Sequence, residues 1–310
     1  MKKIIFVTVL CFYACICLDA QETSSQDYLN RYNALVKAGG YSGLGINTLV
    51  DKWIHDFPNE YMPHRAKFMS YLLSSKNEKV TRMNLQKYLG QEPVITLRDS
   101  TGKPVNYFRE VTYDDNLFAQ AIKEIDKAIL LSPLNLELRL SKITALCGYE
   151  KDSPDMAVSS LNALIDYNFT QSPKWTYPGV EKVDEEFFSA LVQEYCYTFF
   201  RYASSESGYA SFKSVSERML SYRPNDILFL DNLGSYYLVY EKNNKVALKY
   251  YNKVLKKKPD DMTAIKNCII LARTTKNKKL EKKYLPKFIK FSTDTTAVEA
   301  AKLRLKSILN

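Results

Sequence analysis

The feature that most constrains the fold is a pattern of apolar positions with helical spacing that recurs about every 34 residues. It is clearest from Ile227 to Pro259, where two helical patterns share one turn and the second ends at a proline. The first pattern consists of Leu230, Leu233, Gly234 and Tyr237, which are 3, 1 and 3 residues apart. The second consists of Ala247, Tyr251, Val254 and Pro259, which are 4, 3 and 5 residues apart. An amphipathic helix pair cannot bury its apolar face alone, so a recurring pair predicts a stack.

The second pattern recurs elsewhere in the chain with a proline in phase. The matches are Ala121, Ile125, Ala128 and Pro133, then Ile46, Val50, Trp53 and Pro58 with bulkier residues, and Phe212, Ser216, Met219 and Pro224 with a poorer fit. The proline ends each helix because it lacks a donor and restricts the residue before it. These offsets resemble helices A and B of the tetratricopeptide repeat. The resemblance implies an all-α fold, a TPR-like α-solenoid of stacked helix pairs.

The proline spacings place the irregular segments. We expect the solenoid to occupy residues 21–310, with an insertion at about 76–113 and a capping helix at about 294–309. In the insertion we predict a short helix from Glu78 to Leu89 and then a β-hairpin, because Val94–Arg98 and Val105–Phe108 flank a loop that contains glycine. A loop from Tyr167 to Val183 is also expected. The predicted helices are 27–37, 44–57, 61–74, 79–89, 114–131, 135–149, 154–167, 184–203, 208–222, 226–241, 245–258, 261–274, 278–291 and 294–309.

The first twenty residues resemble a secretory signal. Two lysines precede a run of 15 mostly apolar residues, Ile4–Leu18, which is too short to span a bilayer as a helix. We predict a signal peptide at 1–20, with cleavage after Ala20. A lipoprotein with Cys15 at its N-terminus and a membrane-anchoring helix are the alternatives. With a signal peptide, the chain is expected to be exported and either periplasmic or associated with the outer membrane. The triplets 99–101 and 294–296 resemble the O-glycosylation acceptor motif of exported Bacteroidota proteins.

No pattern of catalytic or metal-binding residues is present in the sequence. The two histidines, His55 and His64, have no further ligands at suitable spacing, and the glycines of 39–45 do not form a phosphate-binding motif. Outside the signal only Cys147, Cys196 and Cys268 remain, without CxxC spacing, and we expect small buried residues there, although one pair could form a disulfide. We therefore predict a protein that is not an enzyme and that has no catalytic residues, metal site or cofactor.

The positive charge is concentrated near the C-terminus. The whole chain carries a formal net charge of +10, whereas residues 242–290 alone contain 16 Lys/Arg against 3 Asp/Glu. Five lysines form a basic stripe along one predicted helix: Lys242, Lys245, Lys249, Lys253 and Lys256. The stripe is either a solvated outer face or a surface that binds an acidic partner or an anionic surface. Export argues against nucleic acid as that partner.

The resemblance to tetratricopeptide repeats also implies a partner groove, since helix A in that family lines a surface that holds a peptide or a partner helix. The matching positions here are Asp231, Asn232, Ser235, Lys266, Asn267 and Arg273. The two asparagines would bond a peptide backbone, and the two cations would hold carboxylates. We therefore expect a non-enzymatic exported scaffold that binds a protein or peptide partner in the cell envelope. The alternative is a glycan- or lipid-binding subunit of an envelope complex that uses aromatic residues of the loop at 175–177.

Overall fold

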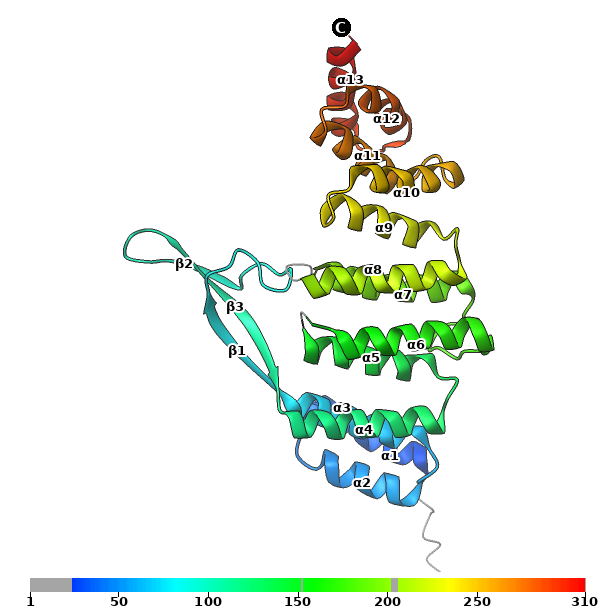
Figure 1. Cartoon of the computed structure of the whole chain (residues 1–310). Coiled ribbons are helices and arrows are strands. Elements are labelled where there is room, and N and C mark those ends of the chain that lie inside the picture. Colours follow the sequence, from blue (N-terminus) through cyan, green and yellow to red (C-terminus); the bar gives the residue numbers. More distant parts are fainter. Residues whose placement is uncertain (1–23, 152, 202–205, 310) are drawn as a thin grey trace, which may run out of the picture.

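The computed structural model describes residues 24–151, 153–201 and 206–309. Within these ranges the chain forms thirteen helices that follow one another along a stack, with α1 near one end and α13 at the other (Figure 1). Their bounds are α1 Ser25–Gly39, α2 Ile46–Asp56, α3 Tyr61–Ser75, α4 Asp115–Leu131, α5 Leu136–Glu150, α6 Asp155–Gln171, α7 Glu185–Arg201, α8 Glu206–Tyr222, α9 Ile227–Val239, α10 Asn244–Lys257, α11 Met262–Thr274, α12 Lys278–Phe291 and α13 Thr295–Leu309.

Helices that are neighbours in the sequence pack against each other, most closely α3 with α4, α9 with α10 and α11 with α12. The predicted all-α class is therefore confirmed, with a small sheet in addition, and this repeat-like stack is compatible with an α-solenoid. Thirteen of the fourteen predicted helices are present, although α6 continues to Gln171, beyond its predicted end. The predicted signal peptide, including Cys15, lies outside the described residues.

Local sequence sets where the C-terminal helices begin. Asn243 precedes α10 and its side chain accepts a hydrogen bond from the backbone N–H of Val246 at 3.2 Å. Asn277 stands 34 residues later, precedes α12 and accepts in the same way from Leu280 at 3.1 Å. Such N-cap residues satisfy backbone donors that have no partner inside the helix. The same cap therefore starts both helices, one repeat period apart.

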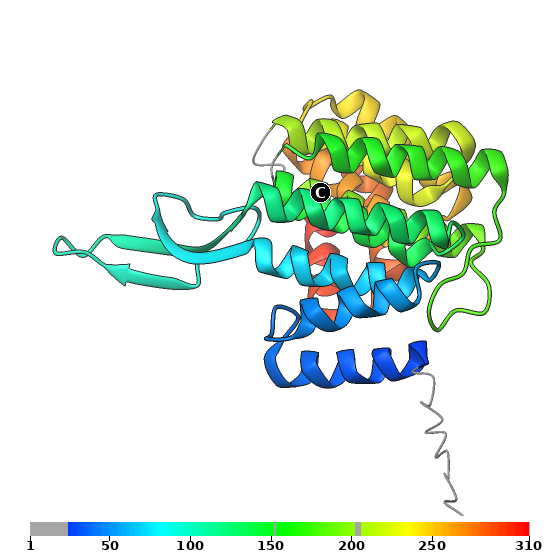
Figure 2. The ribbon, with the colours of Figure 1, turned by 90° about the horizontal axis from the view of Figure 1, so that it is seen from below.

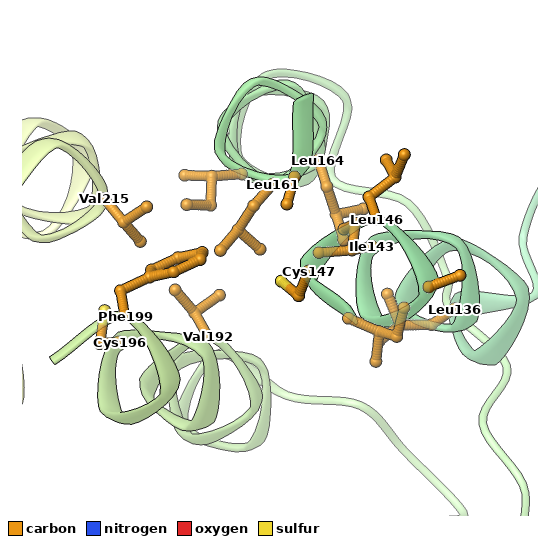
Figure 3. Close-up of a cluster of buried hydrophobic side chains, with 14 of the residues drawn as sticks. Leu136, Ile143, Leu146, Cys147, Leu161, Leu164, Val192, Cys196, Phe199 and Val215 are labelled. Atoms are coloured by element: carbon orange, nitrogen blue, oxygen red, sulfur yellow. The ribbon is translucent and has the colours of Figure 1, made fainter. Parts of the chain in front are cut away.

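The core is formed where the helix pairs contact each other. Gly234 of α9 lies against the ring of Tyr251 of α10, which is fully buried. A larger cluster joins α3 to α9 and includes Cys147 of α5 and Cys196 of α7 (Figure 3). These two cysteines and Cys268 are buried and free, as expected. Burial raises the pKa of all three thiols to about 12, so they stay protonated and unreactive at neutral pH.

The insertion is a three-stranded antiparallel sheet that projects to one side of the helices (Figure 2). Its strands are β1 Lys76–Met83, β2 Ile95–Arg98 and β3 Pro104–Tyr113, in the spatial order β1–β3–β2. The hairpin of β2 and β3 was predicted and is confirmed. The ends of the insertion lie together, because Lys76 pairs with Tyr113 and the backbone N–H of Asp114 donates to the carbonyl of Ser75 at 2.8 Å.

The predicted helix at 78–89 is wrong, since residues 76–83 form β1. The apolar residues Val80 and Met83 stand three positions apart, a spacing that a helix could also use. The deciding factor is β3, which is longer than predicted and pairs with every residue of β1. This ladder satisfies the backbone groups of β1 from a segment about 30 residues away, a non-local effect that overrides local helical spacing.

Candidate partner-binding face

The largest of the hollows described in this section has a volume of about 700 Å³ and lies between α3, α5 and α7. Each helix turns one side toward it. From α5 this side consists of small residues at offsets of 3, 1 and 3, which are Ser141, Thr144, Ala145 and Gly148. Apolar side chains from the three helices also line it, namely Phe68, Met69, Leu72, Leu140 and Leu191. The small residues leave the space that larger side chains would fill.

Polar groups at this hollow are held in place by neighbouring helices. Tyr195 of α7 donates its hydroxyl hydrogen to the backbone carbonyl of Leu140 at 2.9 Å and lies 3.0 Å from the hydroxyl of Thr144. Burial raises the pKa of the Tyr195 phenol, which therefore stays neutral. Glu137 of α5 is engaged by the guanidinium of Arg65 at 2.8 Å. Glu194 lies exposed at the rim, where it can meet a ligand.

The insertion forms one wall of the same hollow. Lys76 and Tyr113 line it, and Tyr113 packs edge-on against Phe118 and Tyr149. The Tyr113 hydroxyl lies only 2.7 Å from the position that a Cβ on Gly148 would occupy. A Cβ built on Gly90, in the loop between β1 and β2, would lie 2.9 Å from the backbone oxygen of Arg201 at the end of α7. The insertion is therefore packed against the helical stack at both α5 and α7.

Three of the predicted groove residues come together at a smaller hollow of about 210 Å³ between α7, α8, α9 and the start of α11. Asp231, Asn232 and Ser235 all line it. Asn232 is buried, and its amide exchanges hydrogen bonds with Gln193 at 2.7 and 3.0 Å and donates to Ser216 at 3.2 Å. Its amide groups are thus already used between helices, whereas Asp231 and Ser235 are only half-buried.

Asp231 is the electrostatically unusual residue of this smaller hollow. Burial, followed by the negative charge of nearby Asp261, raises the pKa of the Asp231 carboxyl to about 8. Its Oδ1 atom is buried and has no hydrogen-bond partner within the described part of the chain. Asp261 itself forms an ion pair with Lys258 at 3.4 Å. Asp231 is consequently protonated at neutral pH and presents a neutral carboxyl group.

The other three predicted groove residues lie on α11. Lys266 and Arg273 line a third hollow, of about 320 Å³, which is bounded by α12 and α13. Lys266 is exposed, and Arg273 also contacts Glu281, at 3.3 Å. Asn267 is half-buried and lines none of these three hollows. Five of the six predicted residues therefore line two separate hollows, and Asn267 lines neither. Sequence reasoning missed the largest hollow, although the small residues of α5 at helical spacing were visible.

The predicted basic stripe lies on and just before α10. Lys242 stands in the turn with a φ of 52°, and the other four lysines are exposed along the helix. These four surround a shallow hollow of about 490 Å³ together with Leu248 and Asn252.

The aromatic loop considered for glycan stacking is largely closed. Trp175 is buried, its indole N–H donates to Asn168 at 2.8 Å, and the guanidinium of Arg139 lies over its ring. A sugar ring needs an open aromatic face, which Trp175 does not offer. Tyr177 is half-buried and lines the largest hollow instead.

In the described residues, no group of three or more His, Cys, Asp or Glu side chains is placed to hold a metal ion. His64 is buried and its Nδ1 lies 2.7 Å from Glu124 Oε2, an interaction between α3 and α4. None of the described helices combines the length and the apolar character needed to cross a bilayer. Comparison with known protein families and with curated proteins finds no match to the chain.

Proposed function

We propose that this chain is a non-enzymatic, exported scaffold of the tetratricopeptide-repeat type that binds a segment of a protein partner in the cell envelope. The observation that carries the proposal is the 700 Å³ hollow, because it is formed by one side each of α3, α5 and α7. Those are the helix A positions of three successive pairs. A groove that crosses several repeats suits an extended peptide or a helix better than a small substrate.

The lining indicates what such a segment would carry. The floor is apolar and the hydroxyls of Ser141 and Thr144 lie among it, so an apolar side chain can enter while the partner backbone bonds to the hydroxyls. Glu194 and Arg201 add one charge of each sign at the α7 side. The expected ligand is therefore a protein segment with an apolar anchor flanked by polar residues.

The test is to fill the hollow without disturbing the core. Thr144 is exposed on α5, so Thr144→Trp should occupy the hollow and leave the fold intact. Gln120→Trp, at an exposed position of α4 that lines none of the hollows named above, is the matched control. A tagged protein should recover a reproducible partner from envelope extracts, the α5 variant should lose it, and the α4 variant should retain it.

Two outcomes would reject the binding component of the proposal. One is equal recovery of the partner by the wild type and Thr144→Trp, which would place binding elsewhere. The other is recovery only on polysaccharide, with no protein partner, which would favour the glycan-binding alternative. A C-terminal antibody that finds the chain only in the cytoplasm would reject the export component.

A further inference from the structure

The row of lysines on α10 recurs on α12 at a sequence distance of 34 residues. Both rows have offsets of 4, 4 and 3, and together they contain Lys245, Lys249, Lys253 and Lys256 and then Lys279, Lys283, Lys287 and Lys290. We call these eight residues the lysine array. Because 34 residues is the repeat period of the stack, each lysine of α10 has its counterpart at the same position on α12.

The two rows meet near Asn252 of α10. The Nζ of Lys283 lies 3.4 Å from the Oδ1 of Asn252, and the hydroxyl of Tyr284 donates to the same oxygen at 2.8 Å. Asn252 belongs to α10 and lines the hollow that the four lysines of that helix surround. The array therefore extends in two dimensions, across two helices and along about 16 Å of each helix, given a rise of about 1.5 Å per residue.

The charge of the array is not neutralised by the protein. Across the described ranges, no carboxylate lies within ion-pair distance of any of the eight lysines. Helix α10 contains no acidic residue, and the one in α12, Glu281, is 1% exposed and is held by Arg273 and Arg304. The only acidic residue of these two helices thus bonds to cations of α11 and α13.

The preceding helix pair, α7 and α8, does not carry a comparable row of lysines. The corresponding positions of α8 stand 35 residues earlier and are Ala210, Ser214, Arg218 and Ser221. Only one of them is a cation, and the guanidinium of that residue, Arg218, forms a two-point ion pair with Asp166 of α6. The unpaired positive surface therefore begins at α10 and is confined to the C-terminal repeats.

We propose that the lysine array binds the surface of a bilayer that contains anionic phospholipids, with its ammonium groups against the lipid phosphates. A two-dimensional array fits a surface, whereas a linear polyanion would follow a single row. All eight cations are lysines, seven of them exposed and Lys287 half-buried. Exposed lysine suits diffuse attraction, while arginine is favoured for the paired contacts of nucleic-acid recognition. Leu248 and Tyr250 are half-buried between lysines of α10, and Lys253 lies 5.3 Å from the Tyr250 ring centroid, as suits a membrane interface.

The test measures binding of the purified full chain to vesicles of phosphatidylcholine with 30% phosphatidylglycerol and to vesicles of phosphatidylcholine alone. Each lysine near an anionic surface strengthens partitioning roughly fivefold. Changing Lys245, Lys249, Lys253 and Lys256 to Gln should therefore weaken binding to the anionic vesicles at least tenfold, and so should the same changes in the α12 row. Wild-type binding should also fall at least tenfold between 0.05 and 0.5 M salt, because the screening length shortens.

The control removes four exposed lysines that lie outside the array, by Lys52→Gln, Lys103→Gln, Lys123→Gln and Lys182→Gln, and so lowers the net charge equally. It should retain most of the binding, and thermal melting should show that all variants fold. The N-terminal apolar run is common to every variant, so it does not contribute to the differences. Equal loss in the control, equal binding to vesicles without anionic lipid, or binding to soluble polyphosphate but not to anionic vesicles would each overturn the proposal.

Discussion

Gly234→Ala tests whether α9 and α10 cross where the repeat spacing places them. A Cβ built on Gly234 would lie 2.5 Å from Cε1 of Tyr251, and two more ring atoms lie within 2.9 Å. Ordinary contacts begin near 3.4 Å, so the ring or the helix would have to move by about 0.9 Å. Tyr251 is fully buried and its hydroxyl lies 3.3 Å from that of Ser235, so it has little freedom to move.

The expected cost follows from two opposing effects. Overpacking a close-packed contact costs about 1–3 kcal/mol, while replacing glycine by alanine inside a helix contributes up to about 1 kcal/mol of stability. The free energy of unfolding should therefore fall by about 1–2 kcal/mol, and Gly234→Leu should lower it further. Denaturant unfolding followed by far-UV circular dichroism measures both values.

Two controls separate this contact from a general effect of alanine. Gly39 is the last residue of α1, and its added Cβ would meet no atom within 4 Å, so Gly39→Ala should be neutral or slightly stabilising. In a Tyr251→Ala background the clash is absent, and Gly234→Ala should become stabilising. If Gly234→Ala and Gly39→Ala unfold at the same denaturant concentration, the helix crossing is misplaced and the reasoning fails.

Three further predictions concern other parts of the chain. Asp231→Asn should be more stable than the wild type by a margin that grows from about pH 4 to pH 8, by up to roughly 6 kcal/mol, because the folded carboxyl keeps its proton up to about pH 8 whereas the unfolded one releases it near 3.8. A margin independent of pH in denaturant melts would contradict this. Replacing residues 77–112 by a short Gly/Ser linker should preserve helicity and cooperative melting. A second deletion that also removes Tyr113 should lower the free energy of unfolding by about 1–2 kcal/mol, because the ring contacts of Tyr113 are lost. Equal melting of the two deletions would show that Tyr113 contributes nothing to stability. Mass spectrometry of the exported protein should find an N-terminus at or near Gln21, and an intact Met1 in the cytoplasm would disprove the signal peptide.

The helices could be predicted from the sequence because their signals are local. Apolar positions at helical spacing, the asparagine caps at 243 and 277 and the prolines after the second helix of a pair all act within a few residues. Gly234 belongs to the repeat pattern, but its close approach to the ring of Tyr251 is known only from the structure. The periodicity therefore determined the order and approximate bounds of the helices described, together with their pairing.

Only the tertiary structure decided features that depend on partners distant in the sequence. Residues 76–83 became a strand because β3 supplies a matching ladder, which no local preference reveals. The largest hollow combines small residues of α5 with α3, α7 and the base of the insertion, so its existence depends on how four segments meet. The burial of Asn232 and the contact of Lys283 with Asn252 likewise depend on neighbouring helices. Helix formation is a local property of the chain, whereas cavities, buried polar contacts and charged surfaces are set by which segments pack side by side.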